Sequence, residues 1–301
     1  MTSNFDDTSA NTSYVGRFAP SPTGPLHFGS LLAALVSFFE AKKHHGQWLV
    51  RIEDLDPPRE MAGADTLILK ALESYGFEWD GDVVYQSQRN EAYQAALDQL
   101  VTNKFAFPCA CSRKQLAPTQ GLHQSECSPP ASDQAFAWRF KCPHTSLEWH
   151  DQLQGAQHFD LLNEVGDFVI KRKEQLWAYQ LAVVVDDHQQ GITDVVRGID
   201  ILDSTAKQIL LQQALGYTTP NYMHMPVACA DNGQKLSKQN HAPALNIEKP
   251  AAILWLALKW LGLNPDPQLK YENVRAQLTW AIDHWDVSSL QGVTEMPAPI
   301  I

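Results

Sequence analysis

Residues 17–30 read Arg17-Phe18-Ala19-Pro20-Ser21-Pro22-Thr23-Gly24-Pro25-Leu26-His27-Phe28-Gly29-Ser30. We predict a short strand over residues 14–19 that ends at this turn, because proline and glycine stop a strand and force the chain to bend. A helix over residues 29–44 should follow, with apolar side chains at helical spacing. Residues 47–52 are predicted as the next strand, and a right-handed parallel crossover is the default for strand–helix–strand.

The turn itself is a candidate ligand site. Ligands of doubly wound sheets bind outside the carboxyl ends of strands, and a helix N-terminus offers unpaired N–H groups to phosphate. Gly29 lets the backbone approach a ligand closely, and His27 can donate to a phosphate oxygen. The competing interpretation is a plain proline-rich turn with a surface histidine.

The length of the whole chain, 301 residues, predicts about two domains. We expect a disordered leader (1–13), the first half of a catalytic core (14–104), a cysteine-rich insertion (105–149), the second half of the core (150–245) and a helical C-terminal part (246–301). Helices are predicted at 59–76, 88–103, 199–215, 250–261 and 274–285, and strands at 167–171, 192–197 and 222–230. Residues 176–185 fit a strand or a helix, and the tail from Ser288 looks frayed.

Composition excludes several classes of protein. Lys and Arg number 23 against 34 Asp and Glu, giving a net charge of −11, which argues against non-specific coating of nucleic acid or anionic membrane. No apolar run approaches the roughly 20 residues of a membrane span. The polar, acidic start of the chain is not a secretory signal. We therefore expect a cytoplasmic protein that uses neither membrane nor DNA.

A second candidate site is the loop Gly233-Gln234-Lys235-Leu236-Ser237-Lys238-Gln239-Asn240. Two lysines three residues apart can hold phosphate oxygens that gain charge in a transition state. The alternative is a solvated basic turn.

Together these two segments resemble the signature pair of class I aminoacyl-tRNA synthetases. His27-Phe28-Gly29-Ser30 stands where that family carries His-Ile-Gly-His, and Lys235-Leu236-Ser237-Lys238-Gln239 where it carries Lys-Met-Ser-Lys-Ser. The opening Arg17–Gly24, together with Arg51-Ile52-Glu53-Asp54-Leu55-Asp56 and Val185-Asp186-Asp187-His188, is similar to the glutamyl branch. The resemblance covers roughly residues 14–245.

Three departures point to a shorter relative. Ser30 replaces a histidine, the second signature ends in Gln-Asn-His, and only about sixty residues follow it, where glutamyl-tRNA synthetases carry a large anticodon-binding part. The chain thus resembles the glutamyl-Q tRNA(Asp) synthetase family. This resemblance implies an α/β fold: a class I synthetase-like Rossmann core with a zinc-bearing insertion and a short helical C-terminal part.

The resemblance also implies substrates and site residues. The family activates L-glutamate with ATP, here expected with magnesium, and transfers it to queuosine-34 in the anticodon loop of tRNA(Asp). Glutamate would contact Arg17, Phe18, Ala19, Pro20, Ser21, Glu53, Tyr179 and Arg197. ATP would contact His27, Gly29, Ser30, Lys235, Ser237 and Lys238, of which Lys238 and His27 would be catalytic.

These residue types suit the chemistry, although each has a plain structural interpretation. An arginine can hold a carboxylate bidentately, and Glu53 can pair with the substrate's ammonium. Alternatively, Glu53 is a helix-capping partner, Tyr179 a core residue and Arg197 part of a surface ion pair. Two other functions stay open: a truncated glutamyl-tRNA synthetase that charges the 3′ end, or a catalytically silent binding protein.

The cysteines form the third constellation. Cys109 and Cys111 are followed by His123 and Cys127. Thiolates and imidazole are the preferred ligands of zinc, and four of them close a structural tetrahedral site. Cys142 or His144 could replace His123, and reduced, metal-free cysteines are the alternative. Cys229, in an apolar strand, is expected to be a buried hydrophobe.

Overall fold

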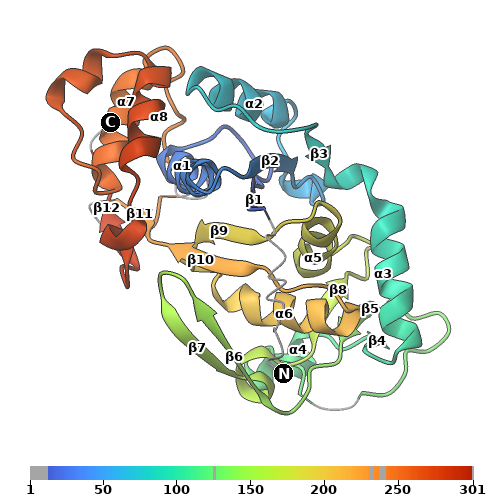
Figure 1. Ribbon diagram of the computed structural model, residues 1–301. Helices are drawn as coiled ribbons and strands as arrows, with labels where there is room; N and C mark the ends of the chain where they lie inside the picture. Colours follow the sequence, from blue (N-terminus) through green and yellow to red (C-terminus); the bar gives the residue numbers. More distant parts are fainter. Residues whose placement is uncertain (1–12, 125–126, 231–232, 237–241, 300–301) are drawn as a thin grey trace, which may run out of the picture.

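The structure is a computed structural model that describes residues 13–124, 127–230, 233–236 and 242–299. Its first half is the predicted crossover (Figure 1). Strand β1 (Val15–Phe18) pairs in parallel with β2 (Gln47–Ile52), and helix α1 (Phe28–Lys43) connects them. Strand β3 (Val84–Tyr85) adds to the far edge of β2.

The second half repeats this arrangement on the other side of β1. Strands β9 (Asp194–Gly198) and β10 (Asn221–Met225) are parallel, and α6 (Asp203–Leu215) connects them. The N–H of Thr193, just before β9, donates to the carbonyl of Val15 at 3.0 Å, which joins the two halves. The direction of strand addition therefore reverses between β1 and β9, and such a switch point is where doubly wound sheets bind ligands.

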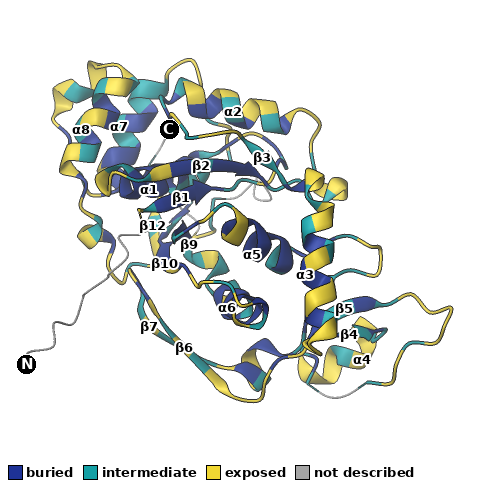
Figure 2. Ribbon diagram, turned by 45° about the vertical axis from the view of Figure 1, so that its right-hand side comes forward, coloured by how far each residue is buried: buried dark blue, intermediate teal, exposed yellow. Residues whose placement is uncertain are grey.

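Aromatic packing explains why α1 lies on this sheet. Helix α1 is buried along most of its length, as are β1 and β2 (Figure 2). The Phe38 ring packs edge-on against Trp48 of β2 and against Phe77, with centroid–centroid distances of 5.2 and 5.3 Å. The indole of Trp48 donates to Ser37 Oγ at 2.9 Å, so its only polar atom is satisfied inside the core.

Helices surround this core. They are α2 (Ala64–Ser74), α3 (Asn90–Thr102) and α5 (Tyr179–Gln189), and short turns of helix lie at Pro57–Arg59, Gln86–Gln88, Ala117–Thr119, Leu161–Val165, Ile199–Ile201, Pro267–Tyr271 and Val287–Leu290. Helix α5 settles the ambiguity at residues 176–185. None of the described helices is long and apolar enough to cross a membrane.

The C-terminal segment is ordered, so the expectation of a frayed tail from Ser288 is wrong. Helices α7 (Pro250–Trp260) and α8 (Val274–His284) pack beside α1, and Trp285 donates to Glu40 at 2.6 Å. Strand β12 (Glu295–Pro297) then pairs in parallel with β11 (Val227–Cys229). Three residues carry too little hydrophobic pattern to reveal a strand, and this pairing partner is remote in sequence.

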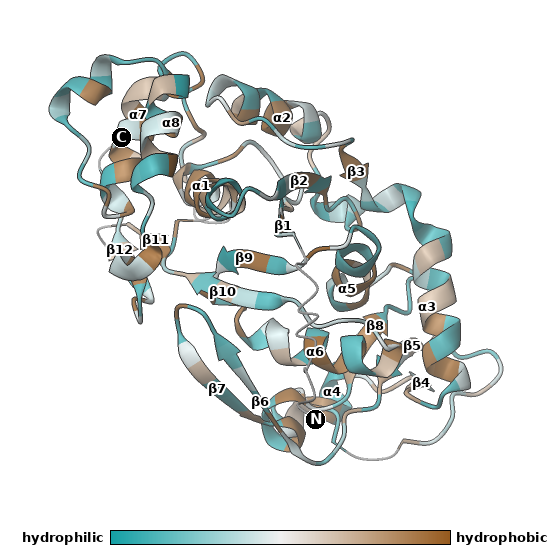
Figure 3. Cartoon of the chain, in the orientation of Figure 1, coloured by the Kyte–Doolittle hydropathy of each residue, from teal (hydrophilic) through white to brown (hydrophobic). Residues whose placement is uncertain are grey.

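The cysteine-rich segment contributes two strands to a small antiparallel sheet, and the third strand comes from later in the chain. Strands β4 (Ala106–Cys109), β5 (Ala137–Phe140) and β8 (Phe168–Lys171) pair in that order, with α4 (Arg113–Leu116) beside them. A hairpin of β6 (Ser146–Asp151) and β7 (Gly155–Asp160) follows and reaches β10. The hairpin is coloured mainly hydrophilic (Figure 3), in keeping with its exposed alternate residues.

Candidate active site

Two adjoining cavities open at the switch point. The smaller, of about 120 Å³, lies between β1 and β9 and is lined by Arg17, Glu53, Tyr179 and Arg197. The larger, of about 360 Å³, is lined by the Pro-Gly turn, His27, Gly29, Ser30 and Lys235. Both touch Phe18, Ala19, Ala33, Gly198 and Ile201. Two ligands bound side by side would therefore meet at the end of β1.

The sequence-predicted residues line both cavities, but the predicted glutamate contacts are not confined to the smaller one. Phe18 and Ala19 face both, while Pro20 and Ser21 line only the larger one. Glu53 reaches the smaller cavity because its N–H donates to the Pro20 carbonyl at 3.0 Å, which joins the end of β2 to the turn. Ser237 and Lys238 lie outside the described residues.

A buried ionic network forms one wall of the small cavity. Arg17 donates from Nε and Nη2 to the two carboxylate oxygens of Asp187, at 3.1 and 3.3 Å. Arg51, which is fully buried, also donates to Asp187, at 2.8 Å. Burial works against ionisation of Asp187, yet the two guanidiniums hold its pKa below the ordinary value. The Nε and Nη2 donors of Arg17 are therefore directed at the protein rather than at the cavity.

Glu53 is the unusual acid of this cavity. Burial raises its pKa to about 7, although Arg51 and Arg17 oppose the shift. Its carboxylate accepts a long hydrogen bond from Arg51 Nη2, at 3.4 Å. A carboxylate with so little stabilisation gains most from a positive partner inside the cavity, such as an ammonium group.

Arg197 has the opposite character, because its charge is not neutralised. It donates to four neutral acceptors: Nε to His224 Nε2 at 2.9 Å, Nη1 to Gln208 at 2.8 Å and to Tyr179 Oη at 3.4 Å, and Nη2 to Thr205 at 2.7 Å. In the described part of the chain, no carboxylate lies within ion-pairing distance of it. A buried cation facing a cavity is a strong attractor for an anionic group.

The larger cavity begins at the N-terminus of α1. His27 is the N-cap, and its Nδ1 accepts a hydrogen bond from the Ser30 N–H at 3.3 Å. The proton of a neutral His27 is therefore on Nε2. A Cβ on Gly29 would lie 3.1 Å from the His27 ring, so a side chain there would press on it.

The predicted lysine loop reaches this cavity through Lys235 and Leu236. The Leu236 N–H donates to the Ala228 carbonyl at 2.8 Å, which ties the loop to β11. Lys235 forms an ion pair with Asp200, and both residues line the cavity. A polyphosphate in the cavity would compete with Asp200 for this ammonium.

Sequence reasoning missed several lining residues, among them Gly198, Asp200 and Ile201. They follow Arg197 directly at the carboxyl end of β9. The rule that ligands bind beyond the carboxyl ends of strands could have identified them. Thr205, Gln208 and His224 carried no comparable signal, since they reach Arg197 only through the folded sheet and α6.

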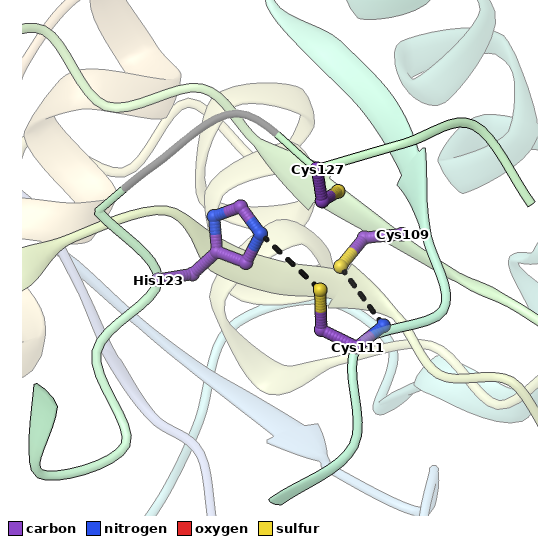
Figure 4. Close-up of side chains that lie close together, drawn as sticks. All are labelled: Cys109, Cys111, His123 and Cys127. Atoms are coloured by element: carbon purple, nitrogen blue, oxygen red, sulfur yellow. Dashed lines mark hydrogen bonds between the residues drawn. The ribbon is translucent and has the colours of Figure 1, made fainter. Parts of the chain in front are cut away.

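The cysteine-rich unit brings together the four predicted metal ligands. The ligand atoms of Cys109, Cys111, His123 and Cys127 all lie within 4.8 Å of one another. Figure 4 shows the four side chains converging on one point. Burial, together with the neighbouring Cys109, raises the pKa of the Cys127 thiol to about 12, and a bound cation would reverse that preference.

The surroundings of His123 fit a metal ligand. Its Nδ1 lies 2.7 Å from Asp167, while Nε2 faces Cys111 Sγ at 3.7 Å. A carboxylate behind the imidazole fixes the tautomer that leaves Nε2 for a metal. Cys142 instead donates to the Leu161 carbonyl, and it is not in the cluster. Cys229 is buried, as expected.

Several known proteins are similar to this chain. Residues 14–134 and 120–251 match the family described as tRNA synthetases class I (E and Q), catalytic domain. The chain is 47% identical to a glutamyl-Q tRNA(Asp) synthetase of Pseudomonas fluorescens, over 96% of this chain and 97% of that protein. It is 48% identical to one of Vibrio vulnificus, over 95% and 94% of the two chains. The chain belongs to the glutamyl-Q tRNA(Asp) synthetase family.

These matches confirm the family that the two signature segments indicated. They also confirm that the protein is a ligase similar to class I aminoacyl-tRNA synthetases. The fold agrees as well. A crystal structure of a glutamate tRNA ligase from Elizabethkingia meningosepticum, in complex with its amino acid, superposes with a TM-score of 0.79 at 24% identity. The superposition covers 95% of this chain and 67% of the ligase chain. The predicted class I synthetase-like α/β fold is therefore confirmed.

Proposed function

We propose that this protein activates L-glutamate with ATP and transfers the glutamyl group to queuosine at position 34 of tRNA(Asp). The observation that carries the proposal is the junction of two cavities of opposite chemistry. The small one offers Arg197 to a carboxylate and Glu53 to an ammonium, which fits an acidic amino acid. The larger one begins at a helix N-terminus and includes Lys235, which fits a nucleotide triphosphate.

The first step joins the two ligands. The α-carboxylate of glutamate attacks the α-phosphorus of ATP, forms the mixed anhydride and releases pyrophosphate. The chain would act by positioning and charge stabilisation, with His27 Nε2 donating to phosphate oxygens and Lys238 meeting developing charge. Magnesium would accompany the pyrophosphate oxygens. No side chain needs to act as a nucleophile.

In the second step, a hydroxyl of the RNA attacks the carbonyl of the anhydride, and AMP leaves. The cyclopentenediol of queuosine has the same vicinal hydroxyls as a terminal ribose. A single-stranded anticodon loop can present one base to a pocket. The named relatives support tRNA(Asp) and queuosine as the acceptor. A location in the cytoplasm, where tRNA is found, accompanies this proposal.

A structural zinc belongs to the same proposal. Cys109, Cys111, His123 and Cys127 would hold it, with Asp167 orienting His123. Such an ion would fix the short strands and loops of residues 105–145 rather than take part in the chemistry.

The experiment labels tRNA(Asp) with radioactive glutamate. Substrates carry queuosine or guanosine at position 34, with and without the 3′-terminal adenosine. Labelling that requires queuosine and survives removal of the adenosine supports the proposal. Equal labelling of the guanosine form, or loss on trimming, would indicate a truncated glutamyl-tRNA synthetase instead. No labelling and no pyrophosphate exchange would indicate a silent binding protein.

A further inference from the structure

Arg197 is held from behind by two residues that line neither cavity. Strands β9 and β10 pair so that His224 lies beside Arg197, and His224 Nε2 accepts a hydrogen bond from Arg197 Nε at 2.9 Å. The other ring nitrogen, Nδ1, lies 2.5 Å from Asp151 Oδ2, at the end of β6. His224 and Asp151 are both 0% exposed.

The donor and acceptor of both hydrogen bonds, from Arg197 to His224 and from His224 to Asp151, can be assigned. An arginine Nε can only donate, so His224 Nε2 must carry the lone pair and Nδ1 the proton. The Asp151 carboxylate can only accept, which selects the same tautomer. Burial, together with the Arg197 charge, lowers the pKa of His224, so the ring stays neutral. Asp151 is itself fixed by the N–H groups of Leu153 and Gln154, at 3.1 and 2.9 Å.

A comparison with Arg17 shows what the neutral ring achieves. Arg17 meets the carboxylate of Asp187 directly and is neutralised by it. At Arg197, the imidazole separates the guanidinium from Asp151. Arg197 is therefore held in position by hydrogen bonds to neutral groups, while its charge still faces the cavity.

We propose that His224, supported by Asp151, is a positioning residue that fixes Arg197 for the substrate's carboxylate without neutralising it. This inference rests on the proposed function, since it takes glutamate as the ligand of the small cavity. It assigns a substrate-affinity role to two residues that do not touch the substrate. It also explains why a hydrogen-bonded pair from β6 and β10 is buried in the sheet beside Arg197 of β9.

The test uses two amide substitutions of similar polarity. In His224→Gln, the amide oxygen reaches the place of Nε2 and can still accept from Arg197. In His224→Asn, the shorter amide can replace only Nδ1 and keeps the link to Asp151. We expect His224→Asn to raise KM for glutamate about tenfold or more, and His224→Gln to stay within about threefold of wild type. KM for ATP should be unchanged in both.

The readouts are glutamate-dependent ATP–pyrophosphate exchange, thermal unfolding and glutamate binding by calorimetry. A residue with a merely structural role would lower the unfolding temperature without separating Asn from Gln in KM. Equal KM values in the two variants would therefore overturn the inference. Calorimetry keeps the test independent of the proposed function: a wild type that binds glutamate but catalyses no exchange contradicts that function, while its variants still report on His224.

Asp151→Asn serves as the second variant if His224→Asn does not fold. An amide at 151 can donate to Nδ1, so the ring proton can move to Nε2 and face the Arg197 Nε–H. Two donors then oppose each other, and KM for glutamate should rise. A folded Asp151→Asn protein with wild-type glutamate affinity would contradict the inference.

Discussion

Arg17 and Asp187, which are 170 residues apart in sequence, form a bidentate ion pair beside the amino-acid cavity. Arg51 makes a second ion pair with the same carboxylate. This arrangement holds β1, β2 and α5 together at the point where the substrate would bind. Arg197 lines the same cavity, and among the described residues it has no carboxylate within ion-pairing distance.

Asp187→Asn should therefore lower the stability of the fold as well as any activity. Removing one partner of a buried ion pair leaves guanidinium charge without compensation, which typically costs about 3 kcal/mol or more. Chemical denaturation measures the free energy of unfolding. The exposed Asp82→Asn is the matched control and should change it by less than about 0.5 kcal/mol. A fully stable Asp187→Asn protein would show that the network is not structural.

Glutamate affinity should depend on the ionisation of Glu53. With a pKa of about 7, this carboxyl is mostly neutral at pH 6 and ionised at pH 8. An ammonium pairs only with the ionised form, so KM for glutamate should rise roughly tenfold from pH 8 to pH 6. Exchange assays across this range check it, with exposed Glu91→Gln as the control. A KM that is flat between pH 6 and pH 8 would contradict the role given to Glu53.

The same pKa predicts an effect on stability. The folded-state pKa of Glu53, about 7, lies above the ordinary glutamate value of 4.5. The stabilisation from the neutral carboxyl is therefore complete below pH 4.5 and lost as the pH rises through 7. At pH 8, Glu53→Gln should raise the free energy of unfolding by roughly 1–3 kcal/mol while abolishing glutamate binding. A destabilised Gln variant at pH 8 would mean that the ionised carboxylate is stabilised by its neighbours.

Metal analysis should find about one zinc per chain. Cys127→Ser should lose the metal and loosen residues 105–145, whereas Cys142→Ser should keep it, because Cys142 lies outside the cluster. Asp167→Asn should weaken zinc binding about ten- to hundredfold, since Asp167 orients His123. Retention after the Cys127 change, with loss after the Cys142 change, would show that the ligand set is wrong.

Lys238→Ala should reduce the rate of exchange about a hundredfold, with KM for ATP within a fewfold of wild type. The reason is that this lysine is expected to meet charge that appears only in the transition state. Lys235 lines the cavity already, so Lys235→Ala should affect KM for ATP more. Exposed Lys104→Ala is the control. Robust exchange without Lys238 removes the catalytic role assigned to it.

The sequence by itself determined the crossover at the N-terminus and the family. Pro20 to Pro25 must end a strand, the apolar periodicity from Leu31 to Phe39 specifies a buried helix, and the two signatures have a fixed chemistry. The cysteine spacing likewise predicted a metal site, because Cys109 and Cys111 are close along the chain, but only the folded structure placed His123, rather than Cys142, in the cluster. These are local properties, and local sequence encodes them. The domain boundaries at residues 105, 150 and 246 stay predictions.

Only the tertiary structure decided which charged groups pair with one another. Arg17, Glu53 and Arg197 were all recognised as candidate glutamate contacts, but their sequence neighbours do not show that Asp187 neutralises Arg17 while a neutral His224 holds Arg197. The sequence of the three residues of β12 also does not predict their pairing with β11. Electrostatics and strand pairing depend on distances between remote segments, and those distances exist only once the chain has folded.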